Sequence, residues 1–280
     1  MRRLLIAILA AILATGAARA PAQPAVPFDH LPALKGGYFR HDSRILGRPL
    51  HIYVRLPADY AEQPERHYPI VYLLDGDSLF PILAAIHLFL TYDDGLPEAI
   101  VVGIAYGGFD PAVNRRDVDF TGPAEGAAPE RAGAPAFQRM LREELLPEVE
   151  RRWRADPARR ILFGQSRGGS FVLYSAFTEP DLFWARIASN PAFEPGRARF
   201  FGAPPSATRR DLRLIVSSGT RDRPHLRATA VEWFRHWAGR GAPWTIRAQT
   251  IEGGTHAADA GTVYREALRW LFPAPPPATP

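Results

Sequence analysis

The sequence predicts an α/β fold in which a mostly parallel central sheet is covered by helices on both faces. Short, almost continuous apolar runs such as YPIVYLLDG (68–76) and EAIVVGIA (98–105) are typical of buried parallel strands. Segments with helical periodicity stand between these runs, and strand and helix patterns alternate along the rest of the chain. With 280 residues, 46% of them hydrophobic, the chain can bury one large core, so a single domain is expected.

The first predicted strand differs from the others. PLHIYVRLP alternates apolar and polar residues over 50–56, which indicates an edge or antiparallel strand. Further strands are expected at 159–164, 183–189, 212–219 and 244–251, and helices at 78–90, 135–154, 168–179, 225–239 and 260–272. Pro147 interrupts the second of these helices, so a kink or a break is expected there. The stretch 106–135 is rich in Gly, Pro and charge without periodicity, and such long loops usually carry function.

The amino terminus has the pattern of a secretory signal peptide. Two arginines at 2–3 precede an apolar run over 4–14, and Ala-Arg-Ala at 18–20 forms a small-residue cleavage site. Cleavage after residue 20 is expected because the run falls short of the ~20 residues that span a bilayer; the alternative is an uncleaved membrane anchor. The mature protein is then expected to be periplasmic or secreted, without stable membrane insertion.

Composition divides the chain and limits its chemistry. After the signal peptide (1–20), residues 21–34 read as a Pro-rich linker or arm, 35–272 as the α/β domain and 273–280 as a disordered Pro-rich tail. The absence of cysteine excludes disulfides, thiolate metal sites and a cysteine nucleophile. The net charge of +5 is spread along the chain without a nucleic-acid motif, so we assign it to solubility and to steering of anionic ligands.

The segment ILFGQSRGGSFVLYSAF (161–177) places Ser166 in a Gly-x-Ser-x-Gly pattern between a predicted strand and a predicted helix. In a nucleophile elbow of this kind the serine lies on a strained turn, and the flanking Gly164 and Gly168 leave room for the neighbouring backbone. The alternative is a Gly-rich turn with an inert serine. The strand-turn-helix context favours the nucleophile.

A serine hydroxyl is a weak nucleophile at neutral pH and needs a general base within hydrogen-bond reach. His256, in EGGTH after the last predicted strand, is the one histidine of eight that is expected at the same end of the sheet as Ser166. Asp222, in LIVSSGTRDRP, is expected to orient the imidazole, and Glu252 and Glu194 are the competing acids. The alternative for Asp222 is a surface pair with Arg221 or Arg223.

An oxyanion hole needs two backbone N–H groups aimed at the developing negative charge. We expect one from Arg167, directly after the nucleophile, and the other from Asp77 in the turn LLDGDSLF. The alternative for this turn is a cation bound by Asp75 and Asp77, which is weakened because no further carboxylates follow nearby. Neither a metal nor a cofactor is expected.

Five segments in order resemble one known family: YPIVYLLDG, NRRDVDFTGP, ILFGQSRGGSFVLYSAF, SNPAF and EGGTH. They are similar to the esterase family that includes esterase D, feruloyl and acetyl-xylan esterases, and the enterobactin-type siderophore esterases. The resemblance runs from about Gly36 to Phe272. It implies an α/β-hydrolase fold, ester substrates, no metal, a nucleophile at Ser166 and a base at His256.

Two features of the resemblance bear on the site. Arg167 occupies a position that is often apolar in the family, and some members resemble a serine–histidine dyad, which leaves the acid open. Arg116 and Asp119 match the family segment R-x-x-D-[YLF]-T. They are expected to form an ion pair that shapes the long loop, with Arg116 as a substrate contact the alternative.

These expectations together predict an exported serine esterase that forms an acyl-enzyme with a small-molecule ester, such as a siderophore, phenolic or carbohydrate ester. Arg167, with Arg221 and Arg223 close by, indicates an anionic or polar acyl group. Two alternatives remain open. One is an acyltransferase that uses the same acyl-enzyme, and the other is a non-catalytic binding protein on a hydrolase scaffold.

Overall fold

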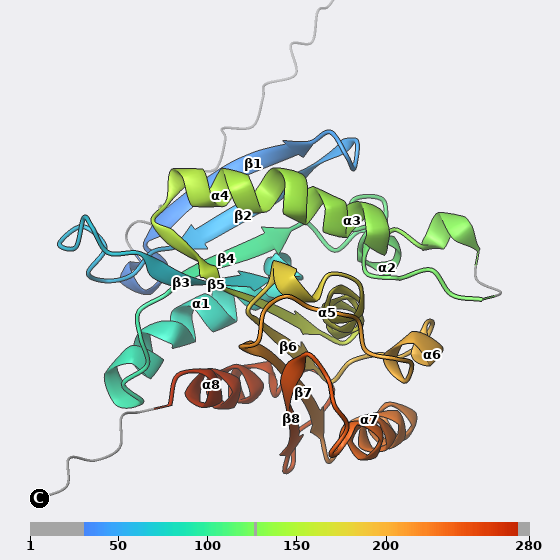
Figure 1. The fold of residues 1–280 in the computed structure, drawn as a ribbon. Coiled ribbons are helices and arrows are strands. Elements are labelled where there is room, and N and C mark those ends of the chain that lie inside the picture. The colour runs from blue at the N-terminus through green and yellow to red at the C-terminus, as the bar shows by residue number, and fades with distance from the viewer. Residues whose placement is uncertain (1–30, 126–127, 274–280) are drawn as a thin grey trace, which may run out of the picture.

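The computed structural model describes residues 31–125 and 128–273, so the expected signal peptide, residues 21–30 of the expected linker and residues 274–280 of the tail lie outside it. The described chain forms an eight-stranded sheet in the order β1-β2-β4-β3-β5-β6-β7-β8 (Figure 1). Its strands are β1 (Gly36–Ser43), β2 (Arg48–Arg55), β3 (Tyr68–Leu73), β4 (Ile100–Ala105), β5 (Ala155–Gln165), β6 (Ala185–Ser189), β7 (Leu212–Gly219) and β8 (Trp244–Ile251). The β1–β2 and β2–β4 pairs are antiparallel and the other five pairs are parallel, which confirms the expected mostly parallel sheet.

Helices cover both faces of this sheet (Figure 1). One face carries α1 (Gly76–Asp93) and α8 (Ala260–Leu271), which contact each other. The other face carries α5 (Arg167–Thr178), α7 (Pro224–Trp237) and the segment made of α3 (Ala134–Met140), the π turn η4 (Leu141–Leu145) and α4 (Leu146–Arg152). Shorter helices lie between them: η2 (Pro32–Leu34), α2 (Arg116–Asp119), η3 (Pro129–Arg131), η5 (Pro180–Leu182) and α6 (Arg197–Phe200).

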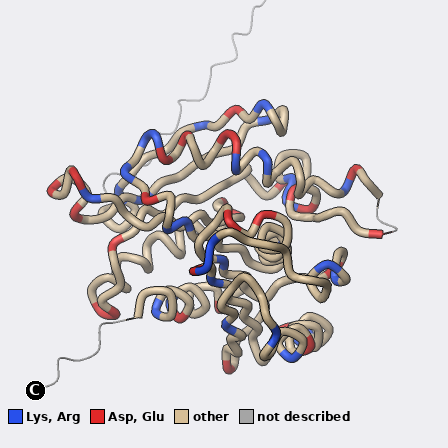
Figure 2. The backbone as a smooth tube through the Cα atoms, viewed as in Figure 1, with Lys and Arg blue, Asp and Glu red and all other residues tan. Residues whose placement is uncertain are grey.

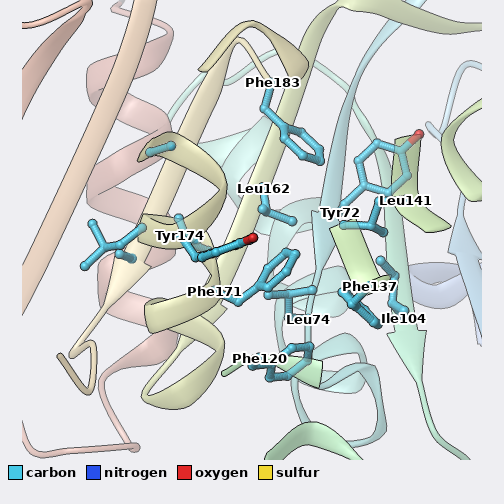
Figure 3. Close-up of a cluster of buried hydrophobic side chains, with 14 of the residues drawn as sticks. Tyr72, Leu74, Ile104, Phe120, Phe137, Leu141, Leu162, Phe171, Tyr174 and Phe183 are labelled. Carbon is cyan, nitrogen blue, oxygen red and sulfur yellow. The ribbon is translucent and has the colours of Figure 1, made fainter. Parts of the chain in front are cut away.

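The central strands are buried on both sides, which explains their continuous apolar sequence. In β3 all six residues are buried; Val71 and Leu73 belong to the core under α1 and α8, whereas Ile70 and Tyr72 belong to the opposite core. In that second core, Figure 3 shows aromatic side chains gathered against the sheet. Phe171 of α5 packs edge-on against Phe137 of α3, with ring centroids 5.1 Å apart, and so fixes α3 against α5.

Three differences from the sequence prediction have local causes. Strand β1 was not predicted, because it begins with two glycines and two of its three buried residues, His41 and Ser43, are polar, so its sequence shows no apolar–polar alternation. The helix over 135–154 neither stops nor breaks at Pro147. Instead it loosens into the π turn just before this proline, which then lies in the first turn of α4, where its missing N–H is tolerated. The long loop contains the short helices α2 and η3 in its described residues.

The distribution of charged residues and the lengths of the apolar helices bear on which partners the described chain can bind and whether a helix of it could cross a membrane. Basic and acidic residues are interleaved along the backbone (Figure 2), so the excess positive charge is distributed rather than concentrated in one element. In the part of the chain that the structure describes, no helix is long and apolar enough to cross a bilayer. Leu34, at the end of the segment expected as a linker, packs against the core under α1.

A buried histidine between α1 and α8 makes the fold sensitive to acid. His87 is 1% exposed, and its Nδ1 lies 2.9 Å from the hydroxyl of Tyr264. Burial, together with the positive charge of Arg55, lowers the pKa of His87 from 6.5 to about 3. The folded protein therefore keeps the imidazole neutral, whereas the unfolded chain binds a proton below pH 6.5. Between pH 6.5 and about 3, the contribution of His87 to the free energy of unfolding falls as the pH falls, by about 1.4 kcal/mol per pH unit.

We expect His87→Phe to flatten this part of the pH–stability curve. Urea unfolding at pH 7 and pH 5 should show the native protein losing about 2 kcal/mol more than the variant, because the variant has no group to protonate at this position. For each protein, the quantity compared is the change in the free energy of unfolding between pH 7 and pH 5. Free energies at a single pH are not compared, because the variant also loses the contact with the Tyr264 hydroxyl. His67→Phe, at an exposed position, is the control; an equal loss in wild type and His87→Phe would contradict the prediction.

Candidate active site

Ser166 lies on the sharp turn between β5 and α5, with φ 58° and ψ −115°. A non-glycine residue in this region of backbone space costs roughly 1–3 kcal/mol, so the surrounding structure must hold it there. Its N–H donates to the carbonyl of Ser189 at 2.9 Å, and its carbonyl accepts from the N–H of Ala192 at 3.0 Å. Ser189 is the last residue of the neighbouring strand β6 and Ala192 follows it, so these two contacts hold the turn against the end of β6.

Each glycine beside Ser166 leaves room for a close neighbour, the backbone of α5 at Gly164 and the carboxylate of Asp75 at Gly168. A Cβ on Gly164 would stand 2.4 Å from the carbonyl oxygen of Gly168, so only glycine lets the strand pass this close to the helix. A Cβ on Gly168 would stand 3.1 Å from a carboxylate oxygen of Asp75. The Gly-x-Ser-x-Gly pattern thus has the steric cause expected for a nucleophile elbow.

His256 and Asp222 stand in line with the serine. His256 Nε2 lies 2.9 Å from Ser166 Oγ, and His256 Nδ1 lies 2.8 Å from Asp222 Oδ1. A carboxylate can only accept, so this contact assigns the ring proton to Nδ1 and leaves Nε2 free to accept from the serine hydroxyl. Asp222 is 7% exposed and also accepts from the N–H of Arg223 at 2.6 Å, which fixes its carboxylate.

The two competing acids stand elsewhere. Glu252 is exposed, and its Oε1 accepts from the hydroxyl of Thr220 at 3.3 Å. Glu194 is also exposed, on the wall of the cavity described below. Within residues 31–125 and 128–273, Asp222 is the carboxylate that hydrogen-bonds His256.

Arg167 and Asp77 each stand at the start of a helix. Arg167 is the first residue of α5 and Asp77 the second of α1. First-turn N–H groups have no acceptor inside their helix, and the helix dipole makes this end favourable for negative charge. The carboxylate of Asp77 accepts from the N–H groups of Tyr106 and Gly107, at 2.7 and 2.8 Å, and ties the start of α1 to the end of β4.

The predicted ion pair between Arg116 and Asp119 is wrong. Arg116 instead makes a bidentate pair with Asp75, with Nε–Oδ1 at 2.7 Å and Nη2–Oδ2 at 3.0 Å. Asp119 pairs with Arg48 and accepts from the hydroxyl of Tyr106 at 2.8 Å. The physical reason lies in Asp75: burial raises the pKa of its carboxyl, and the guanidinium opposes that shift and compensates the buried charge.

Other charges in this region are also matched. Arg167 Nε lies 3.1 Å from Asp117 Oδ1, so its guanidinium forms an ion pair with a carboxylate of α2. Since Asp75 pairs with Arg116 and Asp77 with two amides, neither carboxylate is free for the cation considered above. Across the described residues, no group of three or more Asp, Glu or His side chains could hold a metal ion.

These residues line one cavity of about 840 Å³, within the range of small-molecule sites. The long loop over 106–135 was expected to carry function, and it supplies Phe109, Asn114, Arg116 and Asp117 to the wall. Phe193 lies in the SNPAF segment, whereas Leu226 carries no sequence signal, because α7 brings it to the cavity. Arg223 is part of the wall and Arg221 is not. The lining residues are Asp75, Asp77, Ser78, Phe109, Asn114, Arg116, Asp117, Gln165, Ser166, Arg167, Ala192, Phe193, Glu194, Arg223, His225, Leu226, Thr229 and His256.

The sequence is similar to two curated esterases over part of its length. The chain is 36% identical over 163 residues to the ferri-bacillibactin esterase BesA of Bacillus subtilis, covering 54% of this chain and 56% of that protein. It is 29% identical over 178 residues to the apo-salmochelin esterase of Escherichia coli, covering 58% of this chain and 54% of the relative. The alignments thus span about half the length of these curated relatives.

A solved structure extends the comparison at the level of the fold. The BES protein from Bacillus cereus superposes with a TM-score of 0.72 at 23% identity, covering 85% of this chain and 96% of that one. The expected α/β-hydrolase fold is therefore confirmed. Residues 43–271 match the model of a family described as "Putative esterase". The chain therefore belongs to this esterase family.

Proposed function

We propose that the protein is an exported serine esterase that hydrolyses siderophore-type carboxylic esters through an acyl-enzyme. The observation that carries the proposal is the continuous hydrogen-bonded chain from Asp222 through His256 to Ser166, in which His256 and Ser166 line a cavity of about 840 Å³. A nucleophile, a base and an orienting acid in this order are the parts that acyl transfer needs.

In the first half of the reaction, Ser166 Oγ attacks the ester carbonyl carbon while His256 Nε2 takes the hydroxyl proton. The N–H groups of Arg167 and Asp77 stabilise the negative charge that develops on the carbonyl oxygen. The C–O bond of the ester then breaks, and the imidazolium returns the proton to the leaving alkoxide. The alcohol departs and the acyl group stays on Ser166.

In the second half, water replaces the serine as nucleophile. His256 takes a proton from this water as it attacks the acyl carbon, and the bond to Ser166 Oγ breaks as the proton is returned to it. Asp222 keeps the imidazole in the productive tautomer and stabilises its cation in both halves. The products are one carboxylic acid and one alcohol for each ester consumed.

Export is proposed on the pattern of the amino terminus, with its arginines at 2–3, apolar run at 4–14 and small residues at 18–20. Expression of the full chain in a Gram-negative host, followed by amino-terminal sequencing of the periplasmic protein, should give Pro21 as the first residue. Full-length protein retained in the membrane fraction would contradict cleavage.

The substrate class is proposed from the relatives and from the cavity. Two curated relatives are named as esterases of ferri-bacillibactin and apo-salmochelin, and the cavity combines aromatic walls at Phe109 and Phe193 with cationic ones. Among the described residues, Arg223 is the arginine of this wall whose guanidinium has no carboxylate within 4 Å, whereas the guanidinium groups of Arg116 and Arg167 are both paired. Arg223 is thus the cation best able to meet an anionic group of the substrate.

An ester panel tests the proposal as a whole. Protein lacking residues 1–20 should be labelled by a fluorophosphonate probe and should hydrolyse p-nitrophenyl acetate, with a higher kcat/KM for a cyclic catecholate triester than for feruloyl or acetylated sugars. Product analysis with added glycerol distinguishes hydrolysis from transfer to an alcohol. A protein that takes no label and turns over no ester would sink the proposal.

Arg223→Gln tests the substrate contact. We expect its KM for the catecholate triester to rise about tenfold with kcat nearly unchanged, because a binding contact away from the reacting bond is lost. Its KM for neutral p-nitrophenyl acetate should stay within twofold. Arg221→Gln is the matched control, since Arg221 is a neighbouring exposed arginine outside the cavity wall. An equal rise in both variants would instead indicate long-range attraction by net charge.

A further inference from the structure

Asn190, at the end of β6, makes more contacts around the reacting residues than the mechanism uses. It is 1% exposed and has a left-handed backbone with φ 42°, a conformation that asparagine tolerates better than most residues. Its Oδ1 accepts from the N–H of Gly219 at 2.8 Å, at the end of β7. Its Nδ2 donates to the carbonyls of Thr255 and His256, both at 3.2 Å. The buried amide of Asn190 thus joins the end of β7, shortly before Asp222, to the loop that carries His256.

The two segments joined by this amide also touch directly. A Cβ on Gly219 would stand 2.3 Å from the carbonyl oxygen of Gly254, and that oxygen accepts from the N–H of Arg221 at 2.8 Å. Asp222 follows on one side of this contact and His256 on the other. The Nδ1–Oδ1 distance of 2.8 Å between them therefore depends on how closely the two segments are held.

A buried carboxylate completes the arrangement. Asp259, directly before α8, is 6% exposed, and its Oδ1 accepts from Asn190 Nδ2 at 2.9 Å. Its Oδ2 has no hydrogen-bond partner among the described residues and lies over two glycines, 2.5 Å and 3.0 Å from the positions that a Cβ would take on Gly254 and Gly219. The amide of Asn190 is thus the side-chain donor that compensates this carboxylate within the described chain.

The carbonyl of His256 is held from two sides. Asn190 Nδ2 donates to it from the end of β6, and Gln165 Nε2 donates to it from the residue before the nucleophile. Gln165 therefore holds the main chain of His256 beside the turn of Ser166, and Asn190 holds it beside the turn that carries Asp222. Without the Asn190 contact, the loop of His256 could stay beside Ser166 and still move away from Asp222.

We infer that Asn190 is a positioning residue for the proposed reaction: its amide holds the His256 loop against the Asp222 turn through Gly219 and Asp259. This inference rests on the proposed esterase function and adds a residue outside its triad. Asn190 does not hydrogen-bond Ser166 Oγ and does not itself line the cavity, so it acts through the placement of the imidazole. A misplacement of about 1 Å in such a group is enough to lower a rate about 10²-fold.

Two substitutions test the side-chain amide of Asn190 without straining its backbone at φ 42°. Asn190→Gly removes the side chain, adds no charge and suits the positive φ. Asn190→Asp keeps the shape but turns a carboxylate oxygen toward three acceptors, the carbonyls of Thr255 and His256 and the carboxylate of Asp259. We expect kcat for p-nitrophenyl acetate to fall about 10-fold in the first and about 100-fold in the second, with KM within threefold of wild type.

The control is a second buried amide far from the reacting residues. Gln138 on α3 is 2% exposed, and its Nε2 donates to the hydroxyl of Thr178 at 2.9 Å. Gln138→Glu introduces the same amide-to-carboxylate change and should lower the melting temperature without changing kcat. Assays are run at least 20 °C below each variant's melting temperature, so that lost stability alone does not move kcat.

The rate of fluorophosphonate labelling is the second readout, because it reports the nucleophilicity of Ser166 without any ester turnover. We expect it to fall in parallel with kcat in both Asn190 variants. If both variants keep kcat and labelling within twofold of wild type, the inference is overturned, whatever their melting temperatures. If the wild type itself neither takes the label nor hydrolyses esters, the esterase proposal has failed instead.

Discussion

Replacing Ser166 with alanine is expected to lower kcat for ester hydrolysis by about 10⁵-fold or more and to abolish fluorophosphonate labelling. The alanine removes the oxygen that would form the acyl-enzyme, and the remaining oxyanion donors and cavity supply only a small residual rate. The side chain of Ser166 makes its hydrogen bond to His256 Nε2, and the main-chain contacts of the turn are independent of it.

The same variant separates chemistry from folding. Alanine keeps a Cβ at φ 58°, so the backbone strain is unchanged and the melting temperature should stay within a few degrees of wild type. Activity is measured with p-nitrophenyl acetate and labelling by mass spectrometry of the intact protein. Retained turnover in a folded, unlabelled variant would mean that another group is the nucleophile.

Asp222→Asn is expected to lower kcat by about 10³–10⁴-fold while leaving the fold intact. An amide cannot hold the proton on His256 Nδ1 as a carboxylate does, because its NH₂ group can donate to this nitrogen and favour the wrong tautomer. The imidazolium formed during attack also loses its partner charge. The measurement is kcat and KM for p-nitrophenyl acetate between pH 6 and 9.

Glu252→Gln provides the comparison for the acid. Glu252 is exposed and contacts Thr220 rather than the imidazole, so we expect kcat within twofold of wild type. The opposite ranking, with a small effect at Asp222 and a large one at Glu252, would overturn the assignment. Small effects at both positions would indicate a serine–histidine dyad.

The layered fold could be predicted because each central strand carries its own signal. Strands such as β3 and β4 are buried on both faces and therefore read as continuous apolar runs, and the helices between them keep their own periodicity. Strand β1 was missed because polar residues, His41 and Ser43, occupy two of its buried positions, so the apolar–polar alternation of an edge strand is absent from its sequence. Pairing with β2, rather than its own sequence, makes it a strand.

The residues of the proposed triad could be placed together from the sequence for a related reason. Ser166, Asp222 and His256 each follow a strand of the same parallel sheet, and the carboxyl ends of parallel strands meet at one edge. The partners of charged side chains were not predictable in this way. The resemblance to the family segment R-x-x-D-[YLF]-T suggested a pair of Arg116 with Asp119, but Arg116 pairs with the buried carboxylate of Asp75, 41 residues earlier in the chain. Which carboxylate is buried is a property of the packed structure.

The backbone of Ser166 has a consequence for how this chain can change over generations. Its left-handed conformation is unfavourable for any residue with a Cβ and is natural for glycine. Under the proposed function, this strain of roughly 1–3 kcal/mol is tolerated because the serine oxygen is needed, and a descendant released from that requirement would gain stability by exchanging the side chain for hydrogen. Glycine at this position would then be an early sign that the proposed activity had been lost.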